Sequence, residues 1–351
     1  MNKVLLTGGT GYIGSHTCFV LLKKGFKVVV LDSLVNSSVK SLEGVKKIFG
    51  KDWEFYGDKL KFIRGDINDF DLLIKLFKDN ELMGESIDGV IHFAGLKCVC
   101  ESIKNPIKYW ESNVLGTMNL IKVMNLFSCH NIIFSSSATV YGVKNSENIK
   151  ESSIVCPTNP YGSTKATVEK FLKDVYLSNK KKWNIINLRY FNPIGSHPSG
   201  LIGESPVLIP NNVFPILMDV AFGIKEELKI FGNDWDTFDG TCIRDYVHVM
   251  DLAEAHVKSF EFLFSNKPQF LNINIGTGKG TSVLELVNTF MKVNKVSIKI
   301  SFTSRRDGDL SSVIADNAKA KEILNWTPIR DLSHMCIDGW TWKRLNPEGY
   351  N

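Results

Sequence analysis

Short apolar runs alternate with longer amphipathic stretches along the first 190 residues. The apolar runs are nearly continuous, which is typical of strands that helices cover on both faces. The pattern predicts strands at Lys3–Thr7, Lys27–Asp32, Lys61–Arg64, Gly89–Phe93, Asn131–Ser135 and Asn184–Arg189. It predicts helices at Ser15–Lys24, Asn113–Phe127 and about Tyr161–Ser178. This alternation of strands and helices predicts an α/β fold with a doubly wound, mostly parallel sheet.

The pattern changes after about residue 190. Asn192–Asn212 contains four prolines and three glycines and predicts a long loop region. Beyond it the chain mixes element types, with a strand at Leu228–Phe231 and helices near Val213–Phe222, Asp251–Phe264, Ser282–Lys292 and Leu332–Lys343. We therefore expect a first domain of residues 1–190 and a smaller α+β domain of residues 191–351. Part of residues 244–256 is expected to pack back on the first domain.

A glycine-rich turn follows the first predicted strand and opens the first predicted helix. Gly8, Gly11 and Gly14 have the spacing GxxGxxG. The first glycine permits a tight turn, the second a close approach of backbone to a pyrophosphate, and the third close packing of helix on strand. An anion is favoured at the N-terminus of such a helix. The turn therefore predicts a dinucleotide site of the Rossmann type; a glycine turn without a ligand is the simpler alternative.

Asp32 ends the second predicted strand, 18 residues after Gly14. A carboxylate at this place can accept hydrogen bonds from both hydroxyls of a ribose, and it would repel a 2′-phosphate. The residue therefore favours NAD over NADP as the cofactor.

Tyr161 and Lys165 stand four residues apart at the start of a predicted helix, on one face. Lowering a tyrosine pKa from about 10 to about 7 takes roughly 4 kcal/mol. An ammonium and a positive nicotinamide ring can supply this, which would make Tyr161 a general base. Ser137 ends a strand at the same sheet edge and can donate to a substrate oxygen. Tyr176 and Lys180 have the same spacing, but Lys180 begins a lysine run at a predicted helix end. Solvent exposure and the helix dipole explain a lysine there without a catalytic role.

Composition and charge exclude several classes of protein. Of 351 residues, 44% are hydrophobic and 23% charged, which excludes a disordered, collagen-like or disulfide-dense chain. The 42 basic and 37 acidic residues give no electrostatic case for nucleic acid. No apolar run reaches the ~18 residues of a membrane span, and the N-terminus does not resemble a signal peptide. The seven cysteines are scattered without metal-site spacing, so we expect free thiols, no metal and a cytoplasmic location.

Taken together, these residues resemble the nucleotide-sugar enzymes of the extended short-chain dehydrogenase/reductase superfamily. Within it, the chain is most similar to the 4-epimerases of UDP-galactose and UDP-glucose, over nearly its whole length. The likeness is carried in order by Thr7–His16, Val90–Lys97 (VIHFAGLK), Phe134–Gly142 (FSSSATVYG), Pro160–Lys165 (PYGSTK), Leu188–Gly195 (LRYFNPIG), His197–Gly200 (HPSG), Ile209–Asn212 (IPNN), Ile230–Asp234 (IFGND), Arg244–Asp251 (RDYVHVMD) and Arg305–Asp309 (RRDGD).

The resemblance implies reversible epimerisation with a tightly held NAD that is regenerated in each cycle. Tyr161 is implied to remove the proton of the sugar C4 hydroxyl as hydride passes from C4 to NAD+. The 4-keto sugar then turns over and takes the hydride back on its other face. Lys165 is implied to lower the pKa of Tyr161 and to bind the nicotinamide ribose, and Ser137 to hold the sugar oxygen. A homodimer formed through helices of the first domain is the family expectation.

The resemblance also implies two sets of binding residues. NAD contacts are implied for Gly8, Gly11, Tyr12, Ile13, Gly14, Asp32, Asp66, Ile67, Phe93, Ala94, Gly95, Lys97, Asn113, Ser135, Tyr161, Lys165, Tyr190 and Phe191. UDP-hexose contacts are implied for Lys97, Ser137, Tyr161, Asn192, Asn212, Phe231, Arg244, Tyr246, Arg306, Asp309 and Val313. In the second set the two arginines would hold phosphate, since a guanidinium fork fits its oxygens.

Val313 stands at the family position that gates the sugar pocket. A tyrosine there crowds a 2-acetamido group, whereas a small residue admits it. The valine therefore implies that UDP-GlcNAc and UDP-GalNAc are also substrates. The alternative is a packing valine that has no effect on specificity.

Three other functions compete with epimerisation. A nucleotide-sugar 4,6-dehydratase needs an additional acid and base, and such enzymes carry an Asp-Glu pair where this chain has Ala138-Thr139. An NAD-dependent dehydrogenase with a dissociable cofactor would produce net NADH. A catalytically silent NAD-binding protein would be expected to lack the tyrosine or the lysine.

Overall fold

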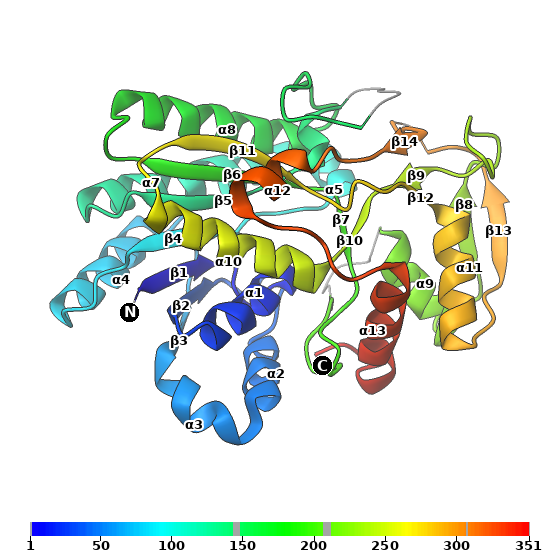
Figure 1. Ribbon diagram of the computed structural model, residues 1–351, viewed down its shortest axis with the longest axis horizontal. Helices are drawn as coiled ribbons and strands as arrows, with labels where there is room; N and C mark the ends of the chain where they lie inside the picture. Colours follow the sequence, from blue (N-terminus) through cyan, green and yellow to red (C-terminus); the bar gives the residue numbers. More distant parts are fainter. Residues whose placement is uncertain (1, 143–147, 206–211, 307, 351) are drawn as a thin grey trace.

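The computed structural model describes residues 2–142, 148–205, 212–306 and 308–350. Two parts of the predicted motifs lie outside these ranges. They are residues 206–211 of the predicted loop, which include three residues of the IPNN motif, and Asp307 of the RRDGD motif. A seven-stranded sheet forms the centre of the fold, with the order β11-β6-β5-β4-β1-β2-β3 (Figure 1). Its strands are β1 (Lys3–Thr7), β2 (Lys27–Asp32), β3 (Leu60–Arg64), β4 (Gly89–His92), β5 (Asn131–Ser137), β6 (Asn184–Tyr190) and β11 (Phe270–Ile275).

All neighbouring strands of this sheet are parallel. The predicted doubly wound α/β fold is therefore confirmed. The strand order reverses beside β1, which is the place where open α/β sheets bind ligands, at the carboxyl ends of the strands.

Helices cover both faces of the sheet and form two separate cores. Val4 and Leu6 of β1 pack toward one core, which receives side chains from α1 (Tyr12–Lys23), α2 (Lys40–Phe49), α10 (Val249–Ser265) and α12 (Ala318–Leu324). Leu5 packs toward the other core, with α4 (Phe70–Leu82), α7 (Gly116–Leu126) and α8 (Pro160–Ser178). Burial on both faces explains why the strands are nearly continuous apolar runs.

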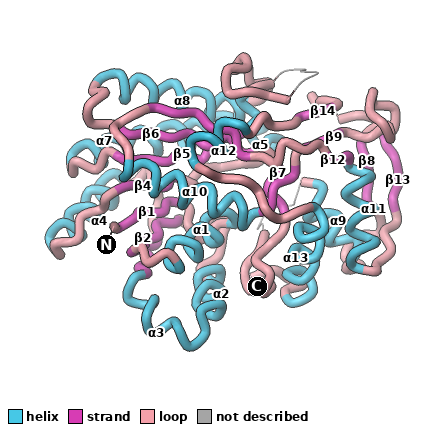
Figure 2. The backbone as a smooth tube through the Cα atoms, in the orientation of Figure 1, coloured by secondary structure: helices cyan, strands magenta, loops and turns pink. Residues whose placement is uncertain are grey.

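The rest of the chain forms short strands around a third core. β7 (Asn192–Ile194) pairs with β10 (Tyr246–His248), and β8 (Leu228–Phe231) pairs with β13 (Ile300–Thr303). β9 (Ile243–Arg244) lies between β12 (Thr281–Ser282) and β14 (Ser312–Val313). The helices are α9 (Val213–Ala221), α11 (Val283–Asn294) and α13 (Leu332–Leu345). Figure 2 shows this part, with its many loops, beside the regular strand–helix alternation of the sheet.

The chain returns to the main sheet after residue 190. α10, which contains much of residues 244–256, packs on α1, and β11 joins the sheet beside β6. β11 was missed in the sequence because Asn272 and Asn274 interrupt its apolar run. Asn187 Nδ2 donates to Asn272 Oδ1, and Tyr141 donates to Asn274 Oδ1, so these polar side chains are paired in the structure.

Several helices differ from the prediction. The segment predicted as a helix from Asn113 begins as a π-helical turn at Trp110–Leu115 and continues as α7. The structure also contains helices that the apolar pattern did not predict: α2, α4 and the short helices α3 (Trp53–Tyr56), α5 (Val99–Lys104) and α6 (Pro106–Tyr109). Within the described ranges, none of the helices is both long enough and apolar enough to cross a membrane.

Candidate functional site

A cavity of about 710 Å³ lies at the carboxyl ends of β1, β2, β4, β5 and β6. This volume falls within the ~300–1,000 Å³ that is usual for small-molecule sites. The cavity is lined by residues from Gly8 to Tyr350, so the two parts of the fold build it together. Among the predicted site residues, the structure places all except Asn113 and Val313 in its lining.

The glycine turn forms one wall of the cavity. Gly8 has a φ of +70°, and a Cβ there would lie 2.7 Å from the backbone nitrogen of Ala94. A Cβ at Gly14 would lie 2.4 Å from the carbonyl oxygen of Gly8. Gly11 is the N-cap of α1, and no described side chain caps the helix there by a hydrogen bond. Glycine backbone that lines the cavity beside a helix N-terminus fits a dinucleotide pyrophosphate.

Asp32 lies buried at the end of β2 and lines the cavity. Its Oδ2 accepts from Thr10 N at 3.0 Å, and its Oδ1 accepts from Leu34 N at 2.9 Å and from Ser37 Oγ at 2.8 Å. A carboxylate has about four acceptor sites, so about one remains for a ribose hydroxyl. This is less than the two bonds that the sequence suggested. Ser37, which also lines the cavity, was missed.

Asn113 lies behind the cavity wall. Its Oδ1 accepts from Leu96 N at 2.7 Å, and its Nδ2 donates to Leu96 O at 3.0 Å and to Thr164 Oγ1 at 3.1 Å. A Cβ at Gly95 would lie 2.9 Å from the same Oδ1. Asn113 therefore holds the loop after β4 in place and does not itself line the cavity.

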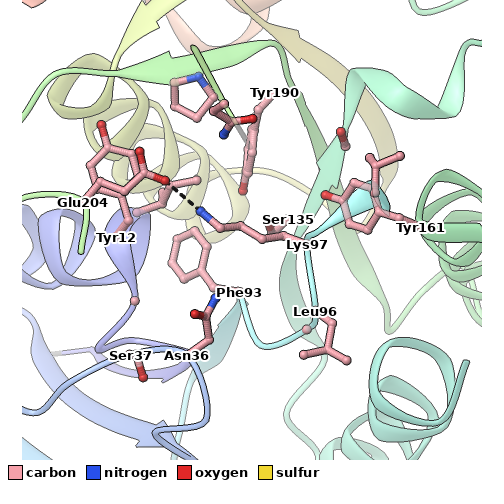
Figure 3. Close-up of a pocket in the computed structure, with 18 of the residues that line it drawn as sticks. Tyr12, Asn36, Ser37, Phe93, Leu96, Lys97, Ser135, Tyr161, Tyr190 and Glu204 are labelled. Carbon is pink, nitrogen blue, oxygen red and sulfur yellow. Dashed lines mark hydrogen bonds and ion pairs between the residues drawn. The ribbon is translucent and has the colours of Figure 1, made fainter. Parts of the chain in front are cut away.

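Tyr161, Lys165 and Ser137 converge at the centre of the cavity lining. α8 begins at Pro160, where Asn159 Oδ1 accepts from Gly162 N at 2.9 Å and caps the helix. The Lys165 Nζ donates to the Ser135 carbonyl at 2.7 Å and lies 5.9 Å from the centre of the Tyr161 ring. Tyr161 and Ser135 face the cavity from different elements (Figure 3). The helix and the strand end thus bring the three side chains together.

The surroundings of Tyr161 and Lys165 shift the pKa values of both side chains. Burial raises the pKa of the Tyr161 phenol, and the hydrogen bond with Ser137 opposes this rise. Burial lowers the pKa of Lys165 to about 8, and the charge of Glu169 opposes that fall. The protein's own groups therefore keep Tyr161 protonated at neutral pH. A lower pKa requires further positive charge in the cavity, because burial is the largest influence on this phenol.

The far end of the cavity carries two arginines. Arg244 Nη1 donates to the carbonyls of Ile243 and Leu310, both at 2.8 Å, and its Nη2 lies 3.5 Å from Asp309 Oδ1. The guanidinium of Arg306 lies 4.0 Å from the centre of the Phe231 ring. Cations and an aromatic face together fit a nucleoside diphosphate.

Tyr246 adds an unpaired polar group to this end. Its hydroxyl is buried and finds no hydrogen-bond partner among the described residues. A buried polar atom without a partner in a cavity wall is the expected sign of a ligand contact.

Val313 lies outside the cavity lining, in β14. It packs against the apolar cluster that contains Val140, Tyr141, Phe191 and Ala315. Phe191 of this cluster also lines the cavity, so the cluster that Val313 packs against reaches the cavity wall.

Glu204 and Tyr350 are among the lining residues that were not predicted. Glu204 lies in the long loop, and its Oε1 is 3.0 Å from Lys97 Nζ across the cavity (Figure 3). Tyr350 is almost the last residue of the chain. No motif or spacing connects either residue to the site, so only tertiary structure reveals them.

A buried ion pair lies beside strand β5. Glu169, one helical turn after Lys165, accepts from Arg189 Nε at 2.9 Å and from Arg189 Nη2 at 2.6 Å. Ser136 Oγ donates to the same carboxylate at 2.5 Å, and Arg189 Nη1 donates to Tyr141 OH at 2.9 Å. The pair thus connects α8, β5 and β6 immediately beside Ser137.

Comparison with known proteins identifies the family. A family model described as GDP-mannose 4,6 dehydratase matches residues 5–338. The UDP-glucose 4-epimerase of Bacillus subtilis (strain 168) is 47% identical over 99% of this chain and 98% of that protein. UDP-glucose 4-epimerase 2 of Arabidopsis thaliana is 46% identical, over 99% of this chain and 97% of that protein. The chain belongs to the UDP-glucose 4-epimerase family.

Solved structures of this epimerase family have the same fold. The enzyme from Stenotrophomonas maltophila, with bound NAD and formylated UDP-arabinopyranose, has a TM-score of 0.93 and 40% identity, covering 99% of both chains. The enzyme from Bifidobacterium longum, in complex with NAD+ and UDP, has a TM-score of 0.91 and 41% identity, covering 99% of this chain and all of that one.

This epimerase-family chain lacks the acidic pair that a nucleotide-sugar 4,6-dehydratase uses as acid and base. Ala138 and Thr139 follow β5 at the place where the dehydratases carry an acidic pair. The Thr139 hydroxyl donates to Ser137 Oγ at 3.0 Å. A methyl group and a hydroxyl that is already engaged cannot act as the acid and base that loss of water requires.

Proposed function

We propose that this chain catalyses the reversible 4-epimerisation of UDP-galactose and UDP-glucose, with NAD as its cofactor. One observation carries the proposal: the glycine turn, Tyr161, Ser137 and the two arginines all line a single cavity. This set of residues suits a dinucleotide, a sugar and a nucleoside diphosphate that are bound together. The family membership of the chain supports the same reaction.

The dinucleotide would be held by the glycine turn, Asp32 and the loops that end β3, β4, β5 and β6. Bound NAD supplies a hydride acceptor and donor for C4 of the sugar. Lys165, held by the Ser135 carbonyl, is placed to bind the nicotinamide ribose. We propose that residues 1–190 bind mainly NAD and residues 191–351 mainly the UDP-sugar.

The chain's own groups would move the proton and hold the sugar. Tyr161 takes the proton from the C4 hydroxyl and returns it to the same oxygen. Ser137 hydrogen-bonds that oxygen, and the charge of Lys165 favours the phenolate. Arg244 and Arg306 hold the diphosphate. Because the sugar is anchored only through UDP, it can turn and present either face of C4.

The remaining binding roles follow the positions in the cavity. Asp66 and Ile67 are proposed to flank adenine, with Phe93, Lys97, Tyr190 and Phe191 along the rest of the dinucleotide. Asn192, Asn212, Phe231, Tyr246 and Asp309 are proposed to contact the UDP part.

A proton NMR time course tests this proposal. Purified protein is mixed with UDP-galactose, first without and then with added NAD. The expected result is UDP-glucose without net NADH, and conversion without added NAD would show that the cofactor is tightly held. Absence of the epimer under both conditions would contradict the proposal, and accumulation of NADH or of a 4-keto-6-deoxy product would identify the alternative reaction.

We also propose that the chain is a cytoplasmic homodimer. Ile103 is 62% exposed and Ile107 72% exposed, in α5 and α6, which pack beside α8 on the first domain. Apolar side chains gathered beside a long helix suit a helix-mediated interface. All seven cysteines are free thiols, as a reducing compartment favours. Sedimentation should give a mass of about twice 39.5 kDa.

Val313 leads to a prediction about specificity. Valine is much smaller than the tyrosine that crowds a 2-acetamido group, so we expect wild type to convert UDP-GalNAc to UDP-GlcNAc as well. Val313→Tyr should lower this activity by about 10- to 100-fold, because the larger ring must enter the cavity or displace its wall. Activity on UDP-galactose should change much less. The ratio of kcat/KM for the two substrates measures the effect, and Val313→Ala is the matched control. Wild-type protein without UDP-GalNAc turnover would show that Val313 is a packing residue alone.

A further inference from the structure

An ion pair crosses the cavity between segments 107 residues apart. Lys97 lies in the loop after β4, and Glu204 lies between β7 and α9. The Glu204 side chain is only 8% exposed, whereas that of Lys97 is 51% exposed. A buried carboxylate loses its hydration, and its charge would repel the phosphates that the proposed function places in this cavity. Burial of the Glu204 carboxylate therefore costs free energy, and a functional role at this place would explain why an acidic residue stands here.

The backbone around Glu204 is anchored by the C-terminal residues. Gly203 N donates to the Tyr350 hydroxyl at 3.1 Å, and Tyr350 N donates to Ser205 Oγ at 3.1 Å. Trp342 Nε1 donates to the Glu204 carbonyl at 3.1 Å. Each of the three consecutive residues 203–205 is thus held by a hydrogen bond from or to this end of the chain.

Close packing adds to these bonds. A Cβ at Gly203 would lie 2.3 Å from Cγ of Trp342, so the backbone at residue 203 is in close contact with the indole ring. The rings of Trp342 and Tyr350 are 4.8 Å apart. Gly349 has a φ of +73°, and a Cβ there would lie 2.1 Å from Ser205 Oγ. Both glycines therefore let the two segments approach closely.

The charge of Glu204 acts on the phosphate-binding side of the cavity. Burial and the Glu204 carboxylate both raise the pKa of Tyr12, which belongs to the first turn of α1. Figure 3 shows Lys97 extended toward Glu204, with Tyr12 beside the carboxylate. An ammonium has three donors, so Lys97 can bind Glu204 and still offer two donors to a phosphate. The pair thus neutralises Glu204 and aims Lys97 across the cavity.

We propose that residues 203–205 form a strap that slows release of the dinucleotide, in which Glu204 orients Lys97 and Tyr350 anchors the strap. The inference rests on the proposed function, because it requires NAD in the cavity. Glu204 and Tyr350 act here as positioning residues. Leaving the cavity then requires the dinucleotide to separate Lys97 from Glu204, or to lift the strap from Trp342 and Tyr350.

The rate of NAD release tests the strap. NAD-loaded protein is mixed with an NAD-hydrolysing enzyme that destroys every released molecule, and the NAD still bound is measured over time. Glu204→Gln, which keeps the shape but removes the charge, should release NAD about fivefold faster than wild type. Tyr350→Phe, which keeps the ring but removes the hydroxyl, should release it about threefold faster. In about 1 M NaCl the difference between Glu204→Gln and wild type should shrink, because the Lys97 side chain is 51% exposed and salt screens its charge.

The control is Asp174→Asn, which removes the exposed Lys170–Asp174 pair on α8 and should leave the release rate unchanged. Unchanged or slower release from both Glu204→Gln and Tyr350→Phe would overturn the strap while leaving the proposed function intact. Wild-type protein that holds no NAD would overturn the proposed function, and the strap with it. Faster release together with an unchanged thermal unfolding temperature of the NAD-free protein would exclude a general loss of stability and support the strap.

Discussion

Tyr161→Phe is expected to lower kcat for UDP-galactose by about 10³-fold, the usual contribution of a general acid–base group. The variant keeps the ring and its packing, and it loses only the oxygen that takes the C4 proton. Burial already raises the pKa of this phenol. Additional positive charge in the cavity must therefore favour its ionisation before it can accept the proton. The initial rate of UDP-glucose formation measures the effect, and the NAD content of the variant is measured beside it.

Tyr176→Phe is the matched control for this variant. Tyr176 has the same spacing to Lys180 that Tyr161 has to Lys165, but its ring packs near Phe270 beside the second core, outside the cavity lining. Its kcat should stay within about twofold of wild type. A Tyr161→Phe enzyme that binds NAD and keeps more than about a tenth of wild-type kcat would remove Tyr161 from the role of general base.

The pH profile of the wild-type enzyme adds a second readout on the same residues. The pKa of Lys165 is lowered to about 8, so its charge is lost as the pH rises through that value. Support for the Tyr161 phenolate weakens when this charge disappears. We therefore expect kcat to stop rising, or to fall, above about pH 8. Tyr161, Tyr190, His92 and Glu169 are the other titratable groups that act on this cluster.

Glu169→Gln is expected to cause the largest loss of stability, about 3–5 kcal/mol in the free energy of unfolding. The side chains of Arg189 and Glu169 are only 2% and 7% exposed, so the variant leaves a buried guanidinium without its counter-charge. The glutamine side chain has the same shape as the glutamate and can still accept from Ser136, which isolates the loss of charge. Urea unfolding followed by circular dichroism measures the change.

The exposed pair on the same helix provides the control. The side chains of Lys170 and Asp174 are 70% and 56% exposed, and Asp174→Asn should change stability by less than about 0.5 kcal/mol. Replacing both buried partners, as in Glu169→Leu with Arg189→Met, should cost less than Glu169→Gln alone, because no charge is then left unpaired. Equal losses in the single and double variants would show that packing at these positions matters and the charge does not.

The central sheet and the glycine turn could be predicted because their signals are local. β1 and β2 begin and end at the predicted residues, because a continuous apolar run of this length is typical of a buried parallel strand. β11 was missed because its asparagines find partners only in neighbouring strands and loops. The π-helical start before α7 was missed for a similar reason: Asn113 is held by the loop after β4, far away in the sequence.

The order of residues along the chain determined the fold class, the dinucleotide turn and the Tyr161–Lys165 pair, because each depends on contacts or spacing within a few residues. Only the tertiary structure decided the electrostatics of that pair, since burial of Tyr161 is the sum of contacts from several elements. The tertiary structure alone showed that Val313 and Asn113 lie outside the cavity lining. It also joined Glu204 to Lys97 and Tyr350, three residues from distant parts of the chain that no local pattern connects.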